Sequence, residues 1–195
     1  MIEVEIKTRI TNPEDLKKKF EKLNGVYKLS LLHEDTYYNM PKELRDFKKT
    51  DEALRIRKSR EFQRDSTEKK ITTYYFTYKG KKIDSLTKSR KELEIKVNDG
   101  LQLREILKSL GFREIFTVKK ERELYEFNYK EYLVEALIDY IPILNEHFME
   151  VEIQVDTKDK LDETREVLFR FLSQFGIKRE NSIRESYLEL IAAKI

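Results

Sequence analysis

The first ten residues place acids and bases on one face of a predicted strand. Residues 1–10 alternate between mostly aliphatic side chains and charged side chains, and the charged positions are Glu3, Glu5, Lys7 and Arg9. Because neighbouring side chains of a strand point to opposite faces, these two carboxylates and two cations share one surface. Such a surface could bind an anion together with metal ions, although the exposed face of a half-buried sheet has the same pattern.

The same alternation of apolar and charged residues recurs in three later segments of the chain. These are residues 54–57, 88–97 and 149–155. If the segments joined one sheet, amphipathic helices could cover its apolar face. Closing that sheet into a barrel would turn the charged face into the wall of a polar tunnel. The repeated pattern therefore favours a tunnel in which carboxylates and cations converge.

Composition limits the partners of the protein and the kind of metal site it can build. The 195 residues include 40 Lys and Arg against 37 Asp and Glu, and the net charge of +3 is too small to indicate nucleic acid as the main partner. The chain has no cysteine, and its two histidines are His33 and His147, so we expect oxygen ligands for any metal. We interpret both histidines as surface or hydrogen-bonding groups.

The chain carries no signal that would direct it to a membrane. Apolar runs do not approach the ~20 residues of a membrane span, and the N-terminal residues lack the apolar core of a signal peptide. We therefore expect a cytoplasmic protein without a membrane partner.

The predicted elements follow one another over residues 1–195 as a single domain. No Pro-, Gly- or Ser-rich linker divides the sequence. After the first strand, Asn12 and Pro13 predict the start of a helix that ends near Gly25. Seven further strands are expected at residues 27–40, 53–60, 71–80, 90–97, 112–128, 131–141 and 147–156. Further helices are expected at residues 101–110, 161–175 and 183–195, and a loop at residues 60–70.

Short motifs follow one another along the whole chain in a characteristic order. The first is EVEIK at residues 3–7, and the next two lie at residues 34–39 and 45–57. The series continues at residues 78–84, 90–94, 120–122, 139, 148–152 and 186–190. It resembles the CYTH superfamily, also called triphosphate tunnel metalloenzymes, and especially its class IV adenylyl cyclase branch. One departure is Lys81, which stands where that branch usually has proline.

The resemblance implies an α+β fold, with helices packed outside a closed eight-stranded antiparallel β-barrel whose lumen binds a linear triphosphate and a divalent metal. The expected phosphate-binding cations are Lys7, Arg55, Arg57, Lys79, Arg90, Lys120 and Arg122, with Arg184 at one tunnel mouth. Carboxylates in such a tunnel would repel phosphate unless a metal ion lay between them. The expected ligands of Mg²⁺ or Mn²⁺ are Glu3, Glu5, Glu92, Glu94, Asp139, Glu150 and Glu152. We expect the catalytic groups to be Glu5, Lys7, Glu150 and Glu152.

Two of these cations conflict with the periodicity of their own strand. Val118 and Leu124 share parity with Lys120 and Arg122, so alternation alone would point residues 119, 121 and 123 into the tunnel. The resemblance selects Lys120 and Arg122 instead. A β-bulge would reconcile the two expectations.

Two enzyme activities fit such a tunnel. In the first, water attacks a terminal phosphorus of tripolyphosphate or of a nucleoside triphosphate, and catalysis consists of positioning and charge neutralisation. In the second, the 3′-hydroxyl of ATP attacks the α-phosphorus and yields cyclic AMP and pyrophosphate. Since we identify no adenine-reading motif, we predict a triphosphatase, with the cyclase as the alternative.

A third hypothesis is a non-catalytic module that binds polyphosphate or nucleic acid through the same cations. It would not need the carboxylates. The enzyme hypotheses, in contrast, predict that removing the carboxylates stops turnover. A second copy of the chain, in a homodimer, is a further candidate partner.

Overall fold

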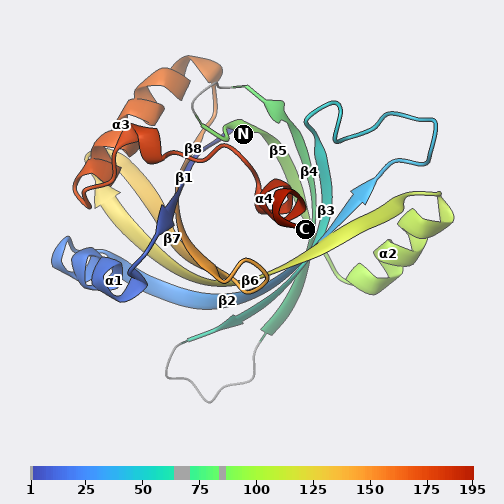
Figure 1. Ribbon diagram of the computed structural model, residues 1–195, viewed down its shortest axis with the longest axis horizontal. Coiled ribbons are helices and arrows are strands. Elements are labelled where there is room, and N and C mark those ends of the chain that lie inside the picture. Colours follow the sequence, from blue (N-terminus) through green and yellow to red (C-terminus); the bar gives the residue numbers. More distant parts are fainter. Residues whose placement is uncertain (1, 64–70, 84–86) are drawn as a thin grey trace.

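Eight antiparallel strands close into a barrel (Figure 1). The structure is a computed structural model that describes residues 2–63, 71–83 and 87–195. Around the barrel the order is β1-β5-β4-β3-β2-β6-β7-β8. The strands are β1 (Ile2–Ile10), β2 (Val26–Asn39), β3 (Ala53–Phe62), β4 (Ile71–Lys82), β5 (Arg90–Val97), β6 (Arg113–Tyr129), β7 (Tyr132–Ile141) and β8 (Glu146–Val155). The α+β class and the closed eight-stranded barrel expected from the sequence are confirmed.

Two sequence expectations reach beyond the described residues. Residues 64–70 of the expected loop lie outside them, and so does Asp84 of the motif at residues 78–84. Within the described part, β3 continues to Phe62 and enters the region expected to be loop.

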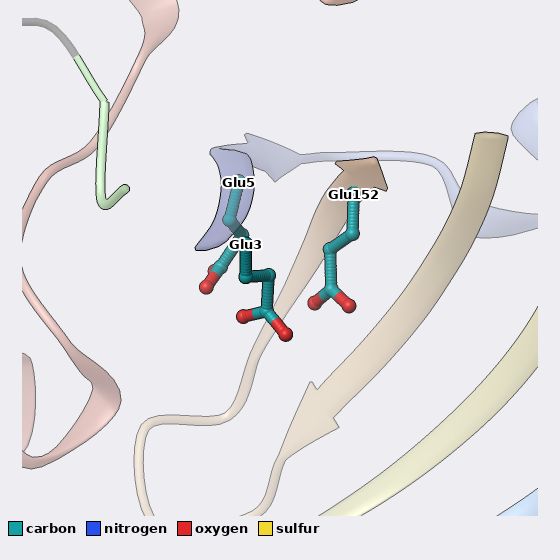
Figure 2. Close-up of side chains that lie close together, drawn as sticks. All are labelled: Glu3, Glu5 and Glu152. Carbon is teal, nitrogen blue, oxygen red and sulfur yellow. The ribbon is translucent and has the colours of Figure 1, made fainter. Parts of the chain in front are cut away.

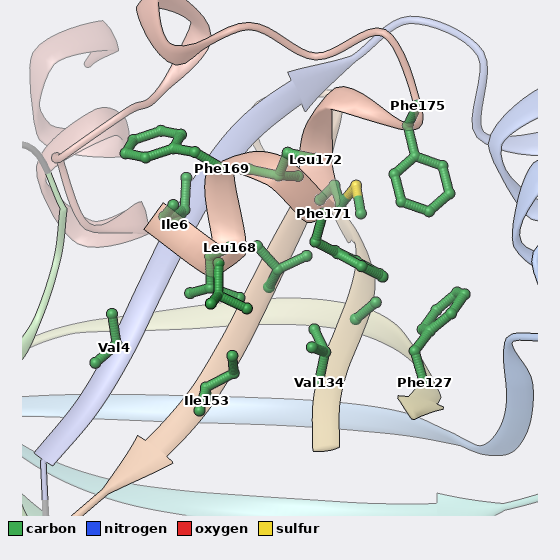
Figure 3. Packing of buried hydrophobic residues seen from close by; sticks show 14 of the residues in the cluster. Val4, Ile6, Phe127, Val134, Ile153, Leu168, Phe169, Phe171, Leu172 and Phe175 are labelled. Atoms are coloured by element: carbon green, nitrogen blue, oxygen red, sulfur yellow. The ribbon is translucent and has the colours of Figure 1, made fainter. Parts of the chain in front are cut away.

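Three helices cover the outer wall of the barrel. They are α1 (Pro13–Lys22), α2 (Gly100–Ser109) and α3 (Leu161–Ser173), and short 3₁₀ turns lie at Lys158–Lys160 and Arg179–Asn181. Helices α1 and α3 bury their apolar sides against β1, β6, β7 and β8. Phe20 and Phe171 each meet Phe127 edge to face, and Figure 3 shows Phe171 beside Phe127. Helix α2 packs on β3 and β4. None of the helices in the described part of the chain has the length and apolar character that a membrane span requires.

Asn12 caps the first helix, as its sequence predicts. Its side-chain oxygen accepts a hydrogen bond from the backbone N–H of Asp15 at 3.0 Å, and Pro13 takes the first helical position. The Asn12 side chain thus satisfies one of the unpaired N–H groups at the helix start, and Pro13 has no N–H group to satisfy.

Replacement of Asn12 by Ala should lower the free energy of unfolding by about 1 kcal/mol, because one helix N–H loses its partner. Urea denaturation followed by circular dichroism would measure the change. Lys18→Ala, on the exposed side of the same helix, is the matched control and should have little effect. Equal stability of Asn12→Ala and the unchanged protein would contradict the role of the cap.

The last helix, α4 (Tyr187–Lys194), begins later than expected and lies across one end of the barrel (Figure 1). It begins there because Ser186 and Glu189 form a reciprocal capping box, with bonds of 3.2 Å and 2.6 Å. The segment before it is irregular and contacts β1, where the Ile183 N–H donates to the Lys7 carbonyl at 2.8 Å.

Val118, one of the two apolar residues that made the periodicity of β6 ambiguous, packs inside the barrel beside α4. Val118 is buried in one cluster with Phe148 of β8 and Tyr187 of α4. Lys120 and Arg122 have the same parity and also lie inside, while Lys119 and Glu121 are exposed. The alternation rule alone was wrong here, because an apolar helix fills this end of the lumen. No bulge interrupts the pairing of β6 with β2 between residues 116 and 124.

Candidate functional site

The barrel encloses a cavity of about 950 Å³ whose wall is densely charged. Residues of all eight strands and of the segment before β5 contribute to it. The charged residues of this wall include Glu3, Glu5, Asp35, Arg55, Arg57, Lys79, Lys88, Arg90, Glu92, Glu94, Lys120, Arg122, Glu150 and Glu152. A cavity of this size lies within the range of small-molecule sites, about 300–1,000 Å³.

Three carboxylates converge on one point of the wall. Glu3 and Glu5 come from β1 and Glu152 from β8, and one oxygen of each lies within 4.8 Å of the others (Figure 2). The pairing of β1 with β8 places Glu5 directly opposite Glu152. Burial raises the pKa of Glu3 to about 7, with Lys79 opposing the shift and Glu92 adding to it. Burial and the neighbouring carboxylates raise the pKa of Glu152 well above its usual value.

The chemistry of this carboxylate cluster suits a hard divalent ion. Carboxylate oxygens are the ligands that Mg²⁺ and Mn²⁺ prefer. The three groups repel one another when ionised, and a dication between them would remove that repulsion. Glu3, Glu5 and Glu152 are therefore the residues that could hold a metal ion.

The other four expected metal ligands contact cations of the protein. Glu92 pairs with Lys79, and Glu94 accepts bonds from Thr77 at 2.7 Å and from Arg55 at 3.4 Å. Asp139 accepts two bonds of 2.6 Å from Arg122, and Glu150 accepts from Lys88 at 2.9 Å. The structure thus gathers three carboxylates into a cluster and pairs the other four with tunnel cations, while Glu5 of the cluster also contacts Lys88.

Two arginines of β3 share one buried aspartate that the sequence expectations did not include. Asp35 of β2 accepts bonds from Arg57 at 2.7 Å and 2.8 Å and from Arg55 at 3.3 Å. Burial alone would raise the pKa of Asp35, but Arg57 and Arg55 hold it well below its usual value. Asp35 could have been identified from the sequence, because it lies in the motif at residues 34–39 and shares parity with Tyr37.

Lys7 lies beneath the C-terminal segment and does not line the cavity. Its ammonium group donates to the Glu185 carbonyl and lies 4.2 Å from the ring centre of Tyr187. Burial lowers the pKa of Lys7 to about 7, and Lys88 adds to the shift. The Tyr187 hydroxyl donates to Asp139 at 2.8 Å, so α4 also covers this carboxylate.

Arg184 lies outside the main cavity. It lines a separate, shallow depression with Asp51, Lys82, Ser182 and Glu185. The segment before α4 is held by the hydrogen bond from the Ile183 N–H to the Lys7 carbonyl. The expected contact between Arg184 and a phosphate chain in the tunnel stays a prediction.

Lys88 and His33 are tunnel residues that the sequence expectations did not assign. Lys88 lies two residues before the start of β5 and shares parity with Arg90 and Glu92, and this parity could have identified it from the sequence. His33 is buried in the cavity wall, where its Nε2 and the Ser59 hydroxyl are 3.1 Å apart. Burial, and then Arg57, lower the pKa of His33, so its imidazole is neutral. The alternative of a surface position was wrong for His33, and its hydrogen-bonding role is confirmed.

Comparisons with known proteins agree with this architecture. A model of the CYTH domain matches residues 1–187. A protein of Methanocaldococcus jannaschii named "Putative adenylate cyclase" is 37% identical over 190 residues, which are 97% of this chain and 98% of that protein. The solved structure of PH1819 from Pyrococcus horikoshii is 34% identical, covers 99% of both chains and has a TM-score of 0.84. A Hippeastrum protein described with a dominant triphosphatase activity shares the fold, with a TM-score of 0.63, 15% identity and coverage of 98% and 96%.

Proposed function

Because the chain belongs to the CYTH domain family, we propose that it is a metal-dependent triphosphatase that hydrolyses tripolyphosphate and also accepts nucleoside triphosphates. The observation that carries the proposal is the position of the carboxylate cluster, Glu3, Glu5 and Glu152. It lies in the same cavity as cations from four strands (β3, β4, β5 and β6) and from the segment before β5. We also take residues 1–195 to be one catalytic domain.

The cations of the wall would bind and orient the phosphate chain. Arg55 and Arg57 present planar guanidinium groups on one side, and Lys79, Arg90, Lys120 and Arg122 extend the positive charge along the lumen. Each of these cations is already held in place by a carboxylate partner or by its position on a strand. Such pre-aligned donors stabilise the charge that spreads over the transferring phosphoryl group.

The carboxylate cluster would hold the divalent ion, Mg²⁺ or Mn²⁺. When bound, such an ion neutralises phosphate charge and polarises the phosphoryl oxygens. Glu3, Glu5 and Glu152 would fix its place at the side of the phosphate chain. The enclosed wall would limit access of bulk water to the reacting phosphorus.

The cyclase remains a second candidate, and two observations favour it. The Methanocaldococcus jannaschii relative carries the name of an adenylate cyclase. The cavity also has aliphatic wall residues, Leu31, Leu124 and Leu137, next to its charged part. These residues could accommodate a nucleoside, which a tripolyphosphate would not need.

A product assay with tripolyphosphate and ATP in parallel separates the candidates. With Mg²⁺ or Mn²⁺ we expect tripolyphosphate to give phosphate and pyrophosphate, detected by ³¹P NMR, and we expect excess chelator to stop the reaction. Reaction of ATP alone, with cyclic AMP as the product, would reverse the ranking. Anion binding without turnover of either compound would support the non-catalytic module.

A further inference from the structure

Lys88 lies in the tunnel between two carboxylates from different strands. Its ammonium group contacts an oxygen of Glu5 on β1 and an oxygen of Glu150 on β8, the latter at 2.9 Å. Its backbone N–H also donates to the Glu5 carbonyl at 3.1 Å. Only 11% of the side chain is exposed, so these contacts are shielded from solvent. Both the backbone and the side chain of Lys88 are therefore fixed to the barrel wall by hydrogen bonds.

The surroundings of Lys88 leave Glu150 fully engaged. One oxygen of Glu150 contacts Lys88, and the other accepts from Arg122. Among the described residues no ion pair reaches Glu152, and the nearest cation to Glu3 is Lys79 at 4.0 Å. Glu5 therefore has carboxylate neighbours on two sides. One side, with Glu3 and Glu152, is open to a metal ion, and the other, with Glu150, holds a lysine ammonium.

We propose that Lys88 is an internal counter-ion that occupies a second cation position, between Glu5 and Glu150. The inference rests on the proposed function, which assigns the carboxylates to metal binding. An ammonium group and a dication cannot share two carboxylates at contact distance, because they repel each other strongly at such separations. The free protein should consequently take up one divalent ion, at Glu3, Glu5 and Glu152.

A triphosphate would change this balance. Its oxygens offer the Lys88 ammonium new acceptors, and lysine is flexible enough to move to them. The gap between Glu5 and Glu150 would then be free for a second ion. Lys88 thereby makes occupation of the second position depend on the substrate, so that a full metal complement assembles only around a bound triphosphate.

Counting bound Mn²⁺ tests the inference without measuring turnover. Lys88→Met removes the charge but keeps an unbranched side chain, and Lys91→Met, at an exposed position of β5, is the matched control. Electron paramagnetic resonance of free Mn²⁺ should give one bound ion for the unchanged protein and for the control, and two for Lys88→Met. In that variant the second ion should bind at least about tenfold more tightly than in the unchanged protein.

A second measurement shows that the variant is folded and that the ion binds the folded state. Mn²⁺ should raise the melting temperature of Lys88→Met more than that of the control, since Glu5 and Glu150 lack their counter-ion until the metal binds. Diimidotriphosphate, whose two bridging nitrogens resist hydrolysis, should bring the unchanged protein to two bound ions in equilibrium dialysis, after the metal bound to free diimidotriphosphate is subtracted.

The outcomes separate this inference from the proposed function. One ion in both the unchanged protein and Lys88→Met, or two ions in the unchanged protein without a triphosphate, would overturn the role of Lys88 and leave the metal site intact. No bound ion in any protein would overturn the metal site, and the proposed function with it. The expected ion counts without hydrolysis of any triphosphate would support the role of Lys88 and refute the triphosphatase.

Discussion

Replacement of Glu3 by Gln should lower the rate of tripolyphosphate hydrolysis by about 100- to 1,000-fold. The amide keeps the shape of the side chain, but it removes one charge from the carboxylate cluster that would hold the metal. Binding of tripolyphosphate without metal should be unchanged or tighter, because a negative charge disappears 4.0 Å from Lys79. Steady-state kinetics and calorimetric titration would measure the two effects separately.

Glu121→Gln is the matched control for this prediction. Glu121 is exposed and lies on β6 with the opposite parity to Lys120 and Arg122, so its replacement removes the same charge outside the tunnel. Its turnover should equal that of the unchanged protein. If Glu3→Gln also kept full turnover, the carboxylates would not be needed for the reaction, and the metal-dependent mechanism would be refuted.

Replacement of Asp35 by Asn should lower the free energy of unfolding by about 3–5 kcal/mol, because two buried arginines lose their shared counter-ion. Arg55 is 6% exposed and Arg57 14%, so water replaces the lost carboxylate poorly. Tripolyphosphate should restore part of the stability, since its oxygens can pair with both guanidinium groups. Urea denaturation with and without tripolyphosphate, in the absence of metal, measures both the loss of stability and its partial recovery.

The neighbouring residue supplies the control. Glu34 pairs with Arg60 and Lys58 on the outer face of β2, and its side chain is 29% exposed. Glu34→Gln should therefore cost no more than about 1 kcal/mol. If Asp35→Asn were as stable as Glu34→Gln, the two arginines would have to be well hydrated in the tunnel, and their mutual alignment by Asp35 would be refuted.

The pH dependence of stability gives an independent readout of Asp35. Its pKa is held below the usual 3.8 in the folded protein, so the ion pairs contribute stability that is fully present above pH 3.8. This contribution is lost as the pH falls through the folded-state pKa. Asp35→Asn lacks it, and its free energy of unfolding should depend less on pH below 3.8 than that of the unchanged protein.

The order of the elements and the direction of most charged side chains could be predicted from the sequence. In β1 and β8 a strict alternation of aliphatic and charged residues is enough, because one face packs on α3 and the other lines the lumen. In β6 the alternation rule predicted the wrong inward-facing residues, and the family motif predicted the right ones. There the inward face is itself partly apolar, since Val118 packs on α4. No local pattern can show that a distant helix will cover part of a lumen.

The C-terminal segment shows a second limit of local patterns. Its apolar residues predicted a helix, and a helix forms. Its position across one end of the barrel depends on contacts with Lys7 and Asp139, which precede it by more than 40 residues. These contacts also explain why Lys7, which the motif placed with the phosphate-binding cations, is covered by Tyr187.

The amino-acid sequence alone determined the family, the number and order of the strands, and which residue types face inward, because these depend on side-chain periodicity and on short motifs. Only the tertiary structure decided which carboxylate faces which cation. Closure of the barrel brings Glu3 and Glu5 beside Glu152, and Lys88 between Glu5 and Glu150, across long stretches of chain. Whether a buried carboxylate can bind a metal ion or is already neutralised by a lysine depends on distances of a few ångströms, which the register of neighbouring strands sets.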